Sequence, residues 1–218
     1  MKNFISFRRY YIDKMLLNFQ FYGKVLDVGG KKINKRGNFV PPENKVEVWH
    51  YLNIDSSTNP DFCCSAEHIP VEDGYYDIVI ITEVLEHLEN PDIVLKECYR
   101  VLKKNGKIVV TIPFLYPLHK DPYDYQRWLP DKINKEFLSV GFKNIEILPM
   151  GGLFAVLFDL FFISITTASK NPDTLMKKIM KNKFILSFLV NLFKILDEKF
   201  NYKSKHITTG YFIIGEKI

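Results

Sequence analysis

Short apolar runs separated by polar stretches make up the first part of the chain. Four of them are nearly continuous rather than alternating: residues 25–28, 46–55, 76–81 and 106–114. An uninterrupted apolar run indicates a strand that is buried on both faces, as in a parallel sheet. Two further runs, at 143–148 and 208–217, predict the last strands of the chain.

Helix signals lie between these runs. Residues 90–106 start with Asn90 as a candidate cap and Pro91 at the first helical position, and they end at Gly106 as a stop signal. Residues 129–142 read as a second capped helix. Because strands and helices alternate, the pattern predicts a doubly wound α/β sheet.

The N-terminus also carries a helical pattern. Its apolar residues recur every three to four positions, which predicts an amphipathic helix over residues 1–20. These residues are Phe4, Phe7, Tyr11, Met15 and Phe19. The stretch lacks the apolar core and cleavage site of a signal peptide. No stretch reaches the roughly 18 apolar residues that a membrane span needs.

After Pro149 the chain becomes more apolar, with a helical pattern, and we predict a helical insertion at 150–205 within a single domain of residues 1–218. Three roles fit it. The helices can pack on the sheet and cap an acceptor pocket, or form a homodimer face. They can also make a peripheral membrane contact through residues 152–200. Four lysines lie between the apolar segments, as in an interfacial anchor. They are Lys177, Lys178, Lys181 and Lys183.

Composition and charge narrow the class of protein. The chain has 218 residues, of which 47% are hydrophobic and 25% charged, a globular balance. None of its three cysteines forms a Cys-x-x-Cys pair, which favours a reducing, cytoplasmic setting. The net charge of +5 comes from residues 166–205, which hold nine lysines and three acids. A basic segment this local argues against a nucleic-acid partner for the main domain.

The turn after the first strand, "VLDVGG", holds the first candidate chemistry. Its glycine spacing does not match the G-x-G-x-x-G of a dinucleotide site, and no P-loop ending follows it. A site for S-adenosylmethionine needs no phosphate cradle. Asp27 can face the ammonium of that cofactor while Gly29 lets the backbone approach. Asp55, which ends the second strand, can accept both ribose hydroxyls.

Residues 65–113 closely resemble the central block of class I S-adenosylmethionine-dependent methyltransferases. The matching pieces are "SAEHIPVEDGYYDIV", "TEVLEHL" and "ECYRVLKKNGKIVVTIP", and with "VLDVGG" and "NID" the likeness covers about residues 23–148. The branch it resembles most is the type 11-like one, which acts on small molecules, lipids and glycans. The resemblance implies a Rossmann-like seven-stranded sheet in the order 3-2-1-4-5-7-6. Strand 7 would be antiparallel, and the helical insertion would lie between strands 6 and 7.

The resemblance also implies which residues hold the cofactor. Asp27, Gly29 and Gly30 would line its methionine end, and Asp55 its ribose. Ser65, Ala66 and Glu67 would edge the adenine, and Thr82, Glu83 and His87 would close the pocket. Two positions depart from the family pattern: Lys31 stands where a glycine is usual, and Ser65 where an acid is usual.

The segment after the fourth strand holds the candidates for the chemistry. It resembles a His-x-x-Pro-x-Asp-Tyr-x-Arg pattern of the glycan-acting branch. We predict His119 as a base or acceptor ligand, with Tyr125 and Arg127 orienting the acceptor; a structured loop with an internal His–Asp bond is the alternative. The spacing of His87, His119 and Asp121 matches no metal-ligand pattern, so we predict no metal site.

These observations favour a methyltransferase that uses S-adenosyl-L-methionine, with O-methylation of a sugar, lipid-linked glycan or other small acceptor as the expected reaction. We expect it to be cytoplasmic, with the membrane contact of residues 152–200 as an addition. Lys31 and Ser65 motivate one rival, a non-catalytic adenosyl-binding or scaffold protein. A dinucleotide oxidoreductase is a second rival, which the missing glycines disfavour.

Overall fold

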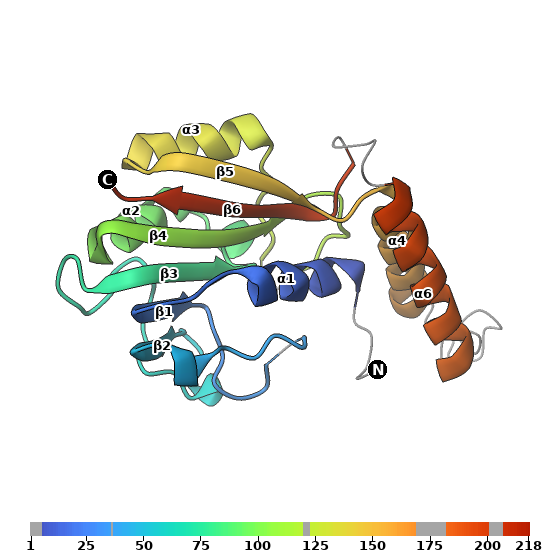
Figure 1. The fold of residues 1–218 in the computed structure, drawn as a ribbon, viewed down its shortest axis with the longest axis horizontal. Helices are drawn as coiled ribbons and strands as arrows, with labels where there is room; N and C mark the ends of the chain where they lie inside the picture. The colour runs from blue at the N-terminus through green and yellow to red at the C-terminus, as the bar shows by residue number, and fades with distance from the viewer. Residues whose placement is uncertain (1–5, 36, 120–122, 169–181, 201–206) are drawn as a thin grey trace.

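The computed structural model describes residues 6–35, 37–119, 123–168, 182–200 and 207–218. Its centre is a six-stranded sheet in the order β2-β1-β3-β4-β6-β5 (Figure 1). The strands are β1 (Lys24–Val28), β2 (Val48–Leu52), β3 (Tyr76–Thr82), β4 (Leu102–Pro113), β5 (Lys143–Met150) and β6 (Gly210–Glu216). Strands β1 to β4 are parallel, and β6 runs antiparallel to both of its neighbours. The α/β class and the antiparallel last strand are therefore confirmed.

The seventh strand that the resemblance implied is not present among the described residues. Its place would be the outer edge of β2, where only one isolated parallel bridge joins Leu52 to Phe62. The chain between β2 and β3 has no apolar run long enough to extend that bridge, and it contains the short 3-10 helix η2 (Ser56–Thr58). Two other 3-10 helices lie outside this connection: η1 (Glu43–Lys45) precedes β2, and η3 (Leu85–His87) follows β3. The sheet thus ends at β2 on this side.

Two helical layers cover the sheet. One face is covered by α2 (Pro91–Val101) and α3 (Pro130–Val140), and the other by α1 (Phe7–Asn18). Along β3, Val79 and Ile81 face the first layer while Ile78 and Ile80 face the second, and all four are buried. Burial on both faces explains why the strands read as continuous apolar runs.

The helix predicted over residues 90–106 is shorter than expected. It ends at Val101, and β4 begins at once with Leu102. The register of β4 against β3 shifts between Tyr76 and Ile78, and Asn105 takes a left-handed backbone with φ +62. Gly106 therefore lies within the strand and does not stop the helix. The lysines before it belong to an irregular strand start, which periodicity could not separate from a last helical turn.

The predicted insertion contains α4 (Leu153–Ala168) and α6 (Lys183–Phe200), which stand between β5 and β6 in the chain. Figure 1 shows this helical pair beyond one end of the sheet, next to α1. Two buried acids join the three helices. Asp159 of α4 accepts hydrogen bonds from the backbone N–H groups of Phe7 and Arg8 at 2.7 and 2.9 Å. None of the described helices is both long and apolar enough to cross a membrane.

The second buried acid, Asp197 of α6, caps the start of α4. Its carboxylate accepts hydrogen bonds from the backbone N–H groups of Gly152 and Ala155 at 3.0 Å each, and from the Tyr11 hydroxyl at 2.6 Å. Free N–H groups at a helix start need such acceptors, and an anion there is favoured by the helix dipole. Lone acids in apolar segments thus fix how α1, α4 and α6 pack.

Candidate active site

A cavity of about 690 Å³ lies at the carboxyl ends of β1, β2 and β3. Ligands of open α/β sheets bind at this edge, and small-molecule pockets measure roughly 300–1,000 Å³. Nine of the ten predicted cofactor residues line it: Asp27, Gly29, Gly30, Asp55, Ser65, Ala66, Thr82, Glu83 and His87. The tenth, Glu67, is exposed and lies outside the lining. His119 lines the cavity too, whereas Tyr125 and Arg127 do not.

Asp27, in β1, is the buried acid of this cavity. Its Oδ1 atom has no hydrogen-bond partner among the described residues. Burial raises the pKa of the Asp27 carboxyl to about 7, although Lys35, the Trp49 side chain and Arg9 oppose the shift. A buried carboxylate oxygen without a donor is costly, and a cationic ligand group would relieve that cost.

Each of the two adjacent glycines is required for a different steric reason. Gly29 has φ +78, and a Cβ atom there would lie 2.4 Å from Val84 Cγ2. At Gly30 a Cβ atom would lie 2.3 Å from the carboxyl carbon of Asp27. Asn53 holds the turn, since its Nδ2 donates to the carbonyl oxygens of both glycines at 3.0 Å. The turn therefore brings bare backbone beside the Asp27 carboxyl, as a close ligand requires.

Asp55 also lines the cavity, three residues after the end of β2. It is exposed, and hydrogen bonds from the Ser57 side chain and from the Ser57 backbone N–H, the latter to Oδ1 at 2.9 Å, lower the pKa of the carboxyl. The charge of Lys31, the residue that departs from the family pattern, adds to that lowering, and Lys31 also lines the cavity. Asp55 is thus ionised at neutral pH and available to hydroxyl donors.

Glu83 ends β3 in a left-handed backbone with φ +56, which is uncommon for a residue with a side chain. Its carboxylate forms an ion pair with Arg8 of α1 at 2.5 Å and accepts the Thr111 hydroxyl at 3.0 Å. The Arg8 guanidinium also lies over the Tyr116 ring, 3.7 Å from its centroid. The amphipathic pattern of residues 1–20 could not reveal this, because an arginine on the buried side of α1 looks like an exception to it.

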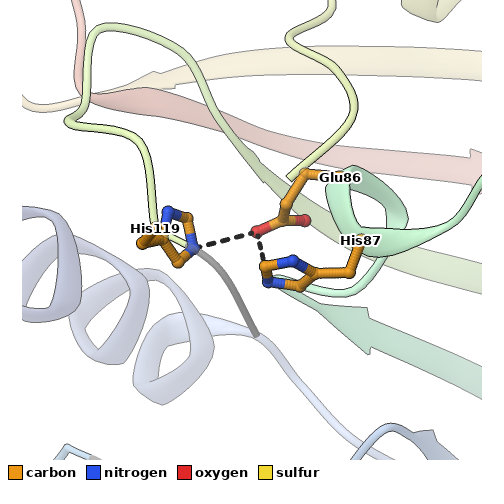
Figure 2. A group of neighbouring side chains, drawn as sticks. All are labelled: Glu86, His87 and His119. Carbon is orange, nitrogen blue, oxygen red and sulfur yellow. Dashed lines mark ion pairs between the residues drawn. The ribbon is translucent and has the colours of Figure 1, made fainter. Parts of the chain in front are cut away.

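Glu86 is a residue that the sequence analysis did not use. It lies in η3 with no exposed surface, and neither carboxylate oxygen has a hydrogen-bond partner among the described residues. Burial and the charge of Glu83 raise the pKa of Glu86 well above its usual range. Figure 2 shows its carboxylate between His87 and His119, with Oε1 at 3.7 Å and 3.8 Å from their Nε2 atoms.

The loop after β4 is attached to η3 by several hydrogen bonds. The Tyr125 backbone N–H donates to the Glu86 carbonyl at 2.8 Å, and Gln126 Nε2 donates to the carbonyls of Leu85 and Leu88 at 3.0 Å. Asp124 accepts the His119 backbone N–H at 3.0 Å and forms an ion pair with Arg127. Tyr125 and Arg127 thus support the loop that carries His119. Asp121 lies outside the described residues.

Comparison with known proteins agrees with this geometry. The family described as a methyltransferase domain, type 11, matches residues 43–110. The curated ubiquinone/menaquinone biosynthesis C-methyltransferase UbiE of Burkholderia mallei is 30% identical over 135 residues, which cover 52% of this chain and 55% of that protein. The UbiE of Burkholderia multivorans is 35% identical over 110 residues, covering 41% and 45%. The chain thus spans about half the length of the curated relatives it matches.

The match to the methyltransferase-domain family over residues 43–110 agrees with the family resemblance seen in the sequence. Solved structures of low identity show the same fold. A methyltransferase from Archaeoglobus fulgidus, described as S-adenosylmethionine-dependent, aligns with a TM-score of 0.58 at 19% identity over 96% of this chain and 94% of that one. Phosphoethanolamine N-methyltransferase 2 of Haemonchus contortus, solved with S-adenosylmethionine, aligns at 0.55 and 18% over 99% of this chain and 54% of that one. The methyltransferase fold thus spans nearly the whole chain.

Proposed function

We propose that this chain is an enzyme that transfers a methyl group from S-adenosyl-L-methionine to a small acceptor. The observation that carries the proposal is the cavity at the strand ends, where Asp27, Asp55 and the glycine turn face one space. The fit to the cofactor rests on the unpartnered Oδ1 of Asp27, which suits an ammonium group, and on Asp55, which suits ribose hydroxyls. When bound, the cofactor supplies a methyl group that is already activated on a sulfonium.

The residues of the chain would then act by positioning. Asp27 and the Gly29 backbone hold the methionine end, Asp55 the ribose, and Ser65 and Ala66 the adenine. Glu83, fixed by Arg8 and Thr111, closes the β3 side of the site. Positioning and exclusion of water supply much of the acceleration of such a displacement.

We propose an oxygen atom of a sugar, lipid-linked glycan or other small molecule as the acceptor. The support is His119, which lines the cavity and can assist loss of a hydroxyl proton. Burial and the nearby charge of Arg8 lower the pKa of His119, so its ring is neutral at pH 7. The curated relatives are named C-methyltransferases, so a ¹³C-methyl label followed by NMR should separate an O-methyl from a C-methyl product.

Binding and turnover test this function separately. Calorimetry with S-adenosylhomocysteine should show one site per chain, with NAD as the negative control; equal affinity for NAD would favour the oxidoreductase reading. Asp55→Ala should abolish binding, and Asp131→Ala on the exposed start of α3 is the matched control. His119→Ala should keep binding and lose turnover. Binding without turnover in the unmodified chain, over a broad acceptor screen, would favour the non-catalytic rival.

We also propose that the α4–α6 pair contacts a membrane surface. The structure places the pair against α1, and none of its described residues lines the cavity, which speaks against the capping role. Phe184 and Phe188 of α6 are 88% and 66% exposed, and Lys183 lies beside them. The double variant Phe184→Asp and Phe188→Asp should lose flotation with anionic liposomes, whereas Leu17→Asp on α1 should not. Unchanged flotation together with loss of a dimer in sedimentation would favour the homodimer instead.

A further inference from the structure

We infer that Glu86, His87 and His119 form a binding site for one divalent transition-metal ion, at the acceptor end of the cavity. Each side chain offers one donor atom, and the three donors lie within 4.8 Å of one another (Figure 2). Two imidazoles and one carboxylate are a common ligand set for zinc and for other divalent transition metals. Sequence spacing did not reveal this ligand set, because its third member is Glu86 and not Asp121.

The distances fit a shared ion better than a hydrogen-bonded network. The Glu86 Oε1 atom is 3.7 Å from His87 Nε2 and 3.8 Å from His119 Nε2, too far for a hydrogen bond, which spans about 2.7–3.2 Å. Two donors at about 2.1 Å from one tetrahedral ion stand about 3.4 Å apart. A shift of a few tenths of an ångström would therefore bring both of these pairs to coordination distance, and the two Nε2 atoms, which lie within 4.8 Å of each other, would have to approach to the same separation.

The environment of the Glu86 carboxylate also favours binding of a cation. Its side chain is fully buried, and both oxygens lack a hydrogen-bond partner among the described residues. The nearby arginines have other carboxylates: Arg8 forms an ion pair with Glu83 and Arg127 with Asp124. A buried carboxylate without a partner is rare, because its desolvation is not compensated. An ion held by Glu86 and the two imidazoles would provide that compensation.

Both histidines are oriented as metal ligands usually are. The His87 Nδ1 atom is hydrogen-bonded to the Tyr123 carbonyl oxygen, so Nδ1 carries the proton and Nε2 presents its lone pair to Glu86. The His119 Nδ1 atom lies 3.5 Å from Asp124 Oδ2, while its Nε2 atom faces Glu86. The carbonyl behind His87 fixes its tautomer, and a carboxylate beside Nδ1, as at His119, favours the proton on that atom and leaves Nε2 for a metal.

The site would also explain how the proposed acceptor is handled, and this part alone rests on the proposed function. Three protein ligands leave coordination positions open, and a hydroxyl bound to a divalent ion loses its proton more easily. In the transfer, the acceptor oxygen would form a bond to the methyl carbon while the carbon–sulfur bond breaks. That electron pair stays on sulfur, and the hydroxyl proton goes to solvent. His119 would then act as a ligand and not directly as the base.

The test titrates chelator-treated protein, without any adenosyl ligand, with Mn²⁺ followed by electron paramagnetic resonance and with Co²⁺ followed by visible absorption. We expect one ion per chain. Glu86→Gln, His87→Gln and His119→Gln should each weaken binding at least ~10-fold, and Asp124→Asn behind His119 by ~10–100-fold. His68→Gln, an exposed histidine outside the cavity lining, is the matched control and should bind like the unmodified chain.

Metal titration and ligand calorimetry test the metal site and the methyltransferase function independently. Thermal unfolding of each variant checks folding, and Glu86→Gln should fold because it removes an unpartnered charge. Absence of a bound ion, or equal affinity in the three ligand variants and the control, would overturn the metal site. Calorimetry with S-adenosylhomocysteine on the same metal-free protein then shows whether the methyltransferase function stands without it.

Discussion

Four buried acids of this protein form two groups that differ in their partners. Asp159 and Asp197, where the helical pair meets α1, accept several hydrogen bonds each. Asp27 and Glu86, at the cavity, are also buried but keep carboxylate oxygens without a hydrogen-bond partner among the described residues. The first group has donors from the chain itself, and the second lies where a ligand would supply them.

The presence or absence of hydrogen-bond donors separates acids that stabilise the fold from acids that can bind a ligand. A fully bonded buried acid contributes to stability, and its loss leaves orphan donors. An unpartnered one lowers stability, and proteins tolerate that mainly at functional sites. Substitutions should therefore have opposite effects in the two groups: loss of stability in one, and loss of binding without loss of stability in the other.

The largest effect is expected for Asp197→Ala. It removes the acceptor of two backbone N–H groups at the start of α4, those of Gly152 and Ala155, and of the Tyr11 hydroxyl, so the free energy of unfolding should fall by about 3–5 kcal/mol. Urea denaturation measures the change. Glu198→Ala next to it removes only a half-exposed ion pair with Lys14 and should change stability by less than about 1 kcal/mol. Equal losses of stability in the two variants would contradict a stabilising role for the buried hydrogen bonds of Asp197.

The opposite behaviour is expected for Asp27→Asn. Affinity for S-adenosylhomocysteine should fall ~10–100-fold, because a charge-assisted bond to the ligand ammonium is lost. At pH 8 the free variant should be at least as stable as the unmodified chain, since it no longer holds a buried charge. Calorimetry and urea denaturation on the same samples give both numbers. A variant that binds normally but unfolds easily would place Asp27 in the first group.

The pH dependence of binding should follow the raised pKa of Asp27. Its carboxyl must lose a proton to face an ammonium, and burial holds its pKa at about 7 against the charges of Lys35 and Arg9. Affinity for S-adenosylhomocysteine should therefore rise about tenfold from pH 6 to pH 8. The same titration of Asp27→Asn should be flatter by that factor. A parallel rise in both proteins would assign the pH effect to another group.

The smallest effect concerns the stability of the ligand-free chain. Because the folded pKa of Asp27 is raised, its stabilising contribution is complete below the unfolded pKa and is lost as the pH rises through about 7. Between pH 6 and pH 8 the unmodified chain should therefore lose about 1.4 kcal/mol relative to Asp27→Asn. Denaturation curves at the two pH values check it. A constant difference between the two proteins would mean that Asp27 does not titrate in this range.

Much of the sheet could be predicted from the sequence, because strands buried on both faces leave long apolar runs. The same holds for the residues at the strand ends: Asp27, Gly29 and Asp55 follow apolar runs and meet at one edge. The seventh strand came from family resemblance and not from any apolar run, and the described structure has only one bridge there. The irregular start of β4 was not predicted, because its lysines are equally compatible with the last turn of a helix.

The acceptor side of the site was harder to predict, since it depends on contacts between distant segments. Glu86 and His119 are 33 positions apart, and hydrogen bonds from Tyr125 and Gln126 bring their loops together. Arg8 reaches Glu83 from a helix that reads as an ordinary amphipathic surface helix. No periodicity records such contacts. One signal was present in the sequence: Glu86 and His87 are adjacent polar residues in a segment that otherwise ends a buried strand.

The central claim is that the unpartnered Asp27 and the strand-end cavity form a site for an adenosyl cofactor. Calorimetric titration of the metal-free chain with S-adenosylhomocysteine at pH 8 tests it most directly. We predict one site per chain in the unmodified protein and in Asp197→Asn, and strongly weakened binding in Asp27→Asn. Absence of binding in the unmodified chain, or equal affinity in all three proteins, would contradict the account.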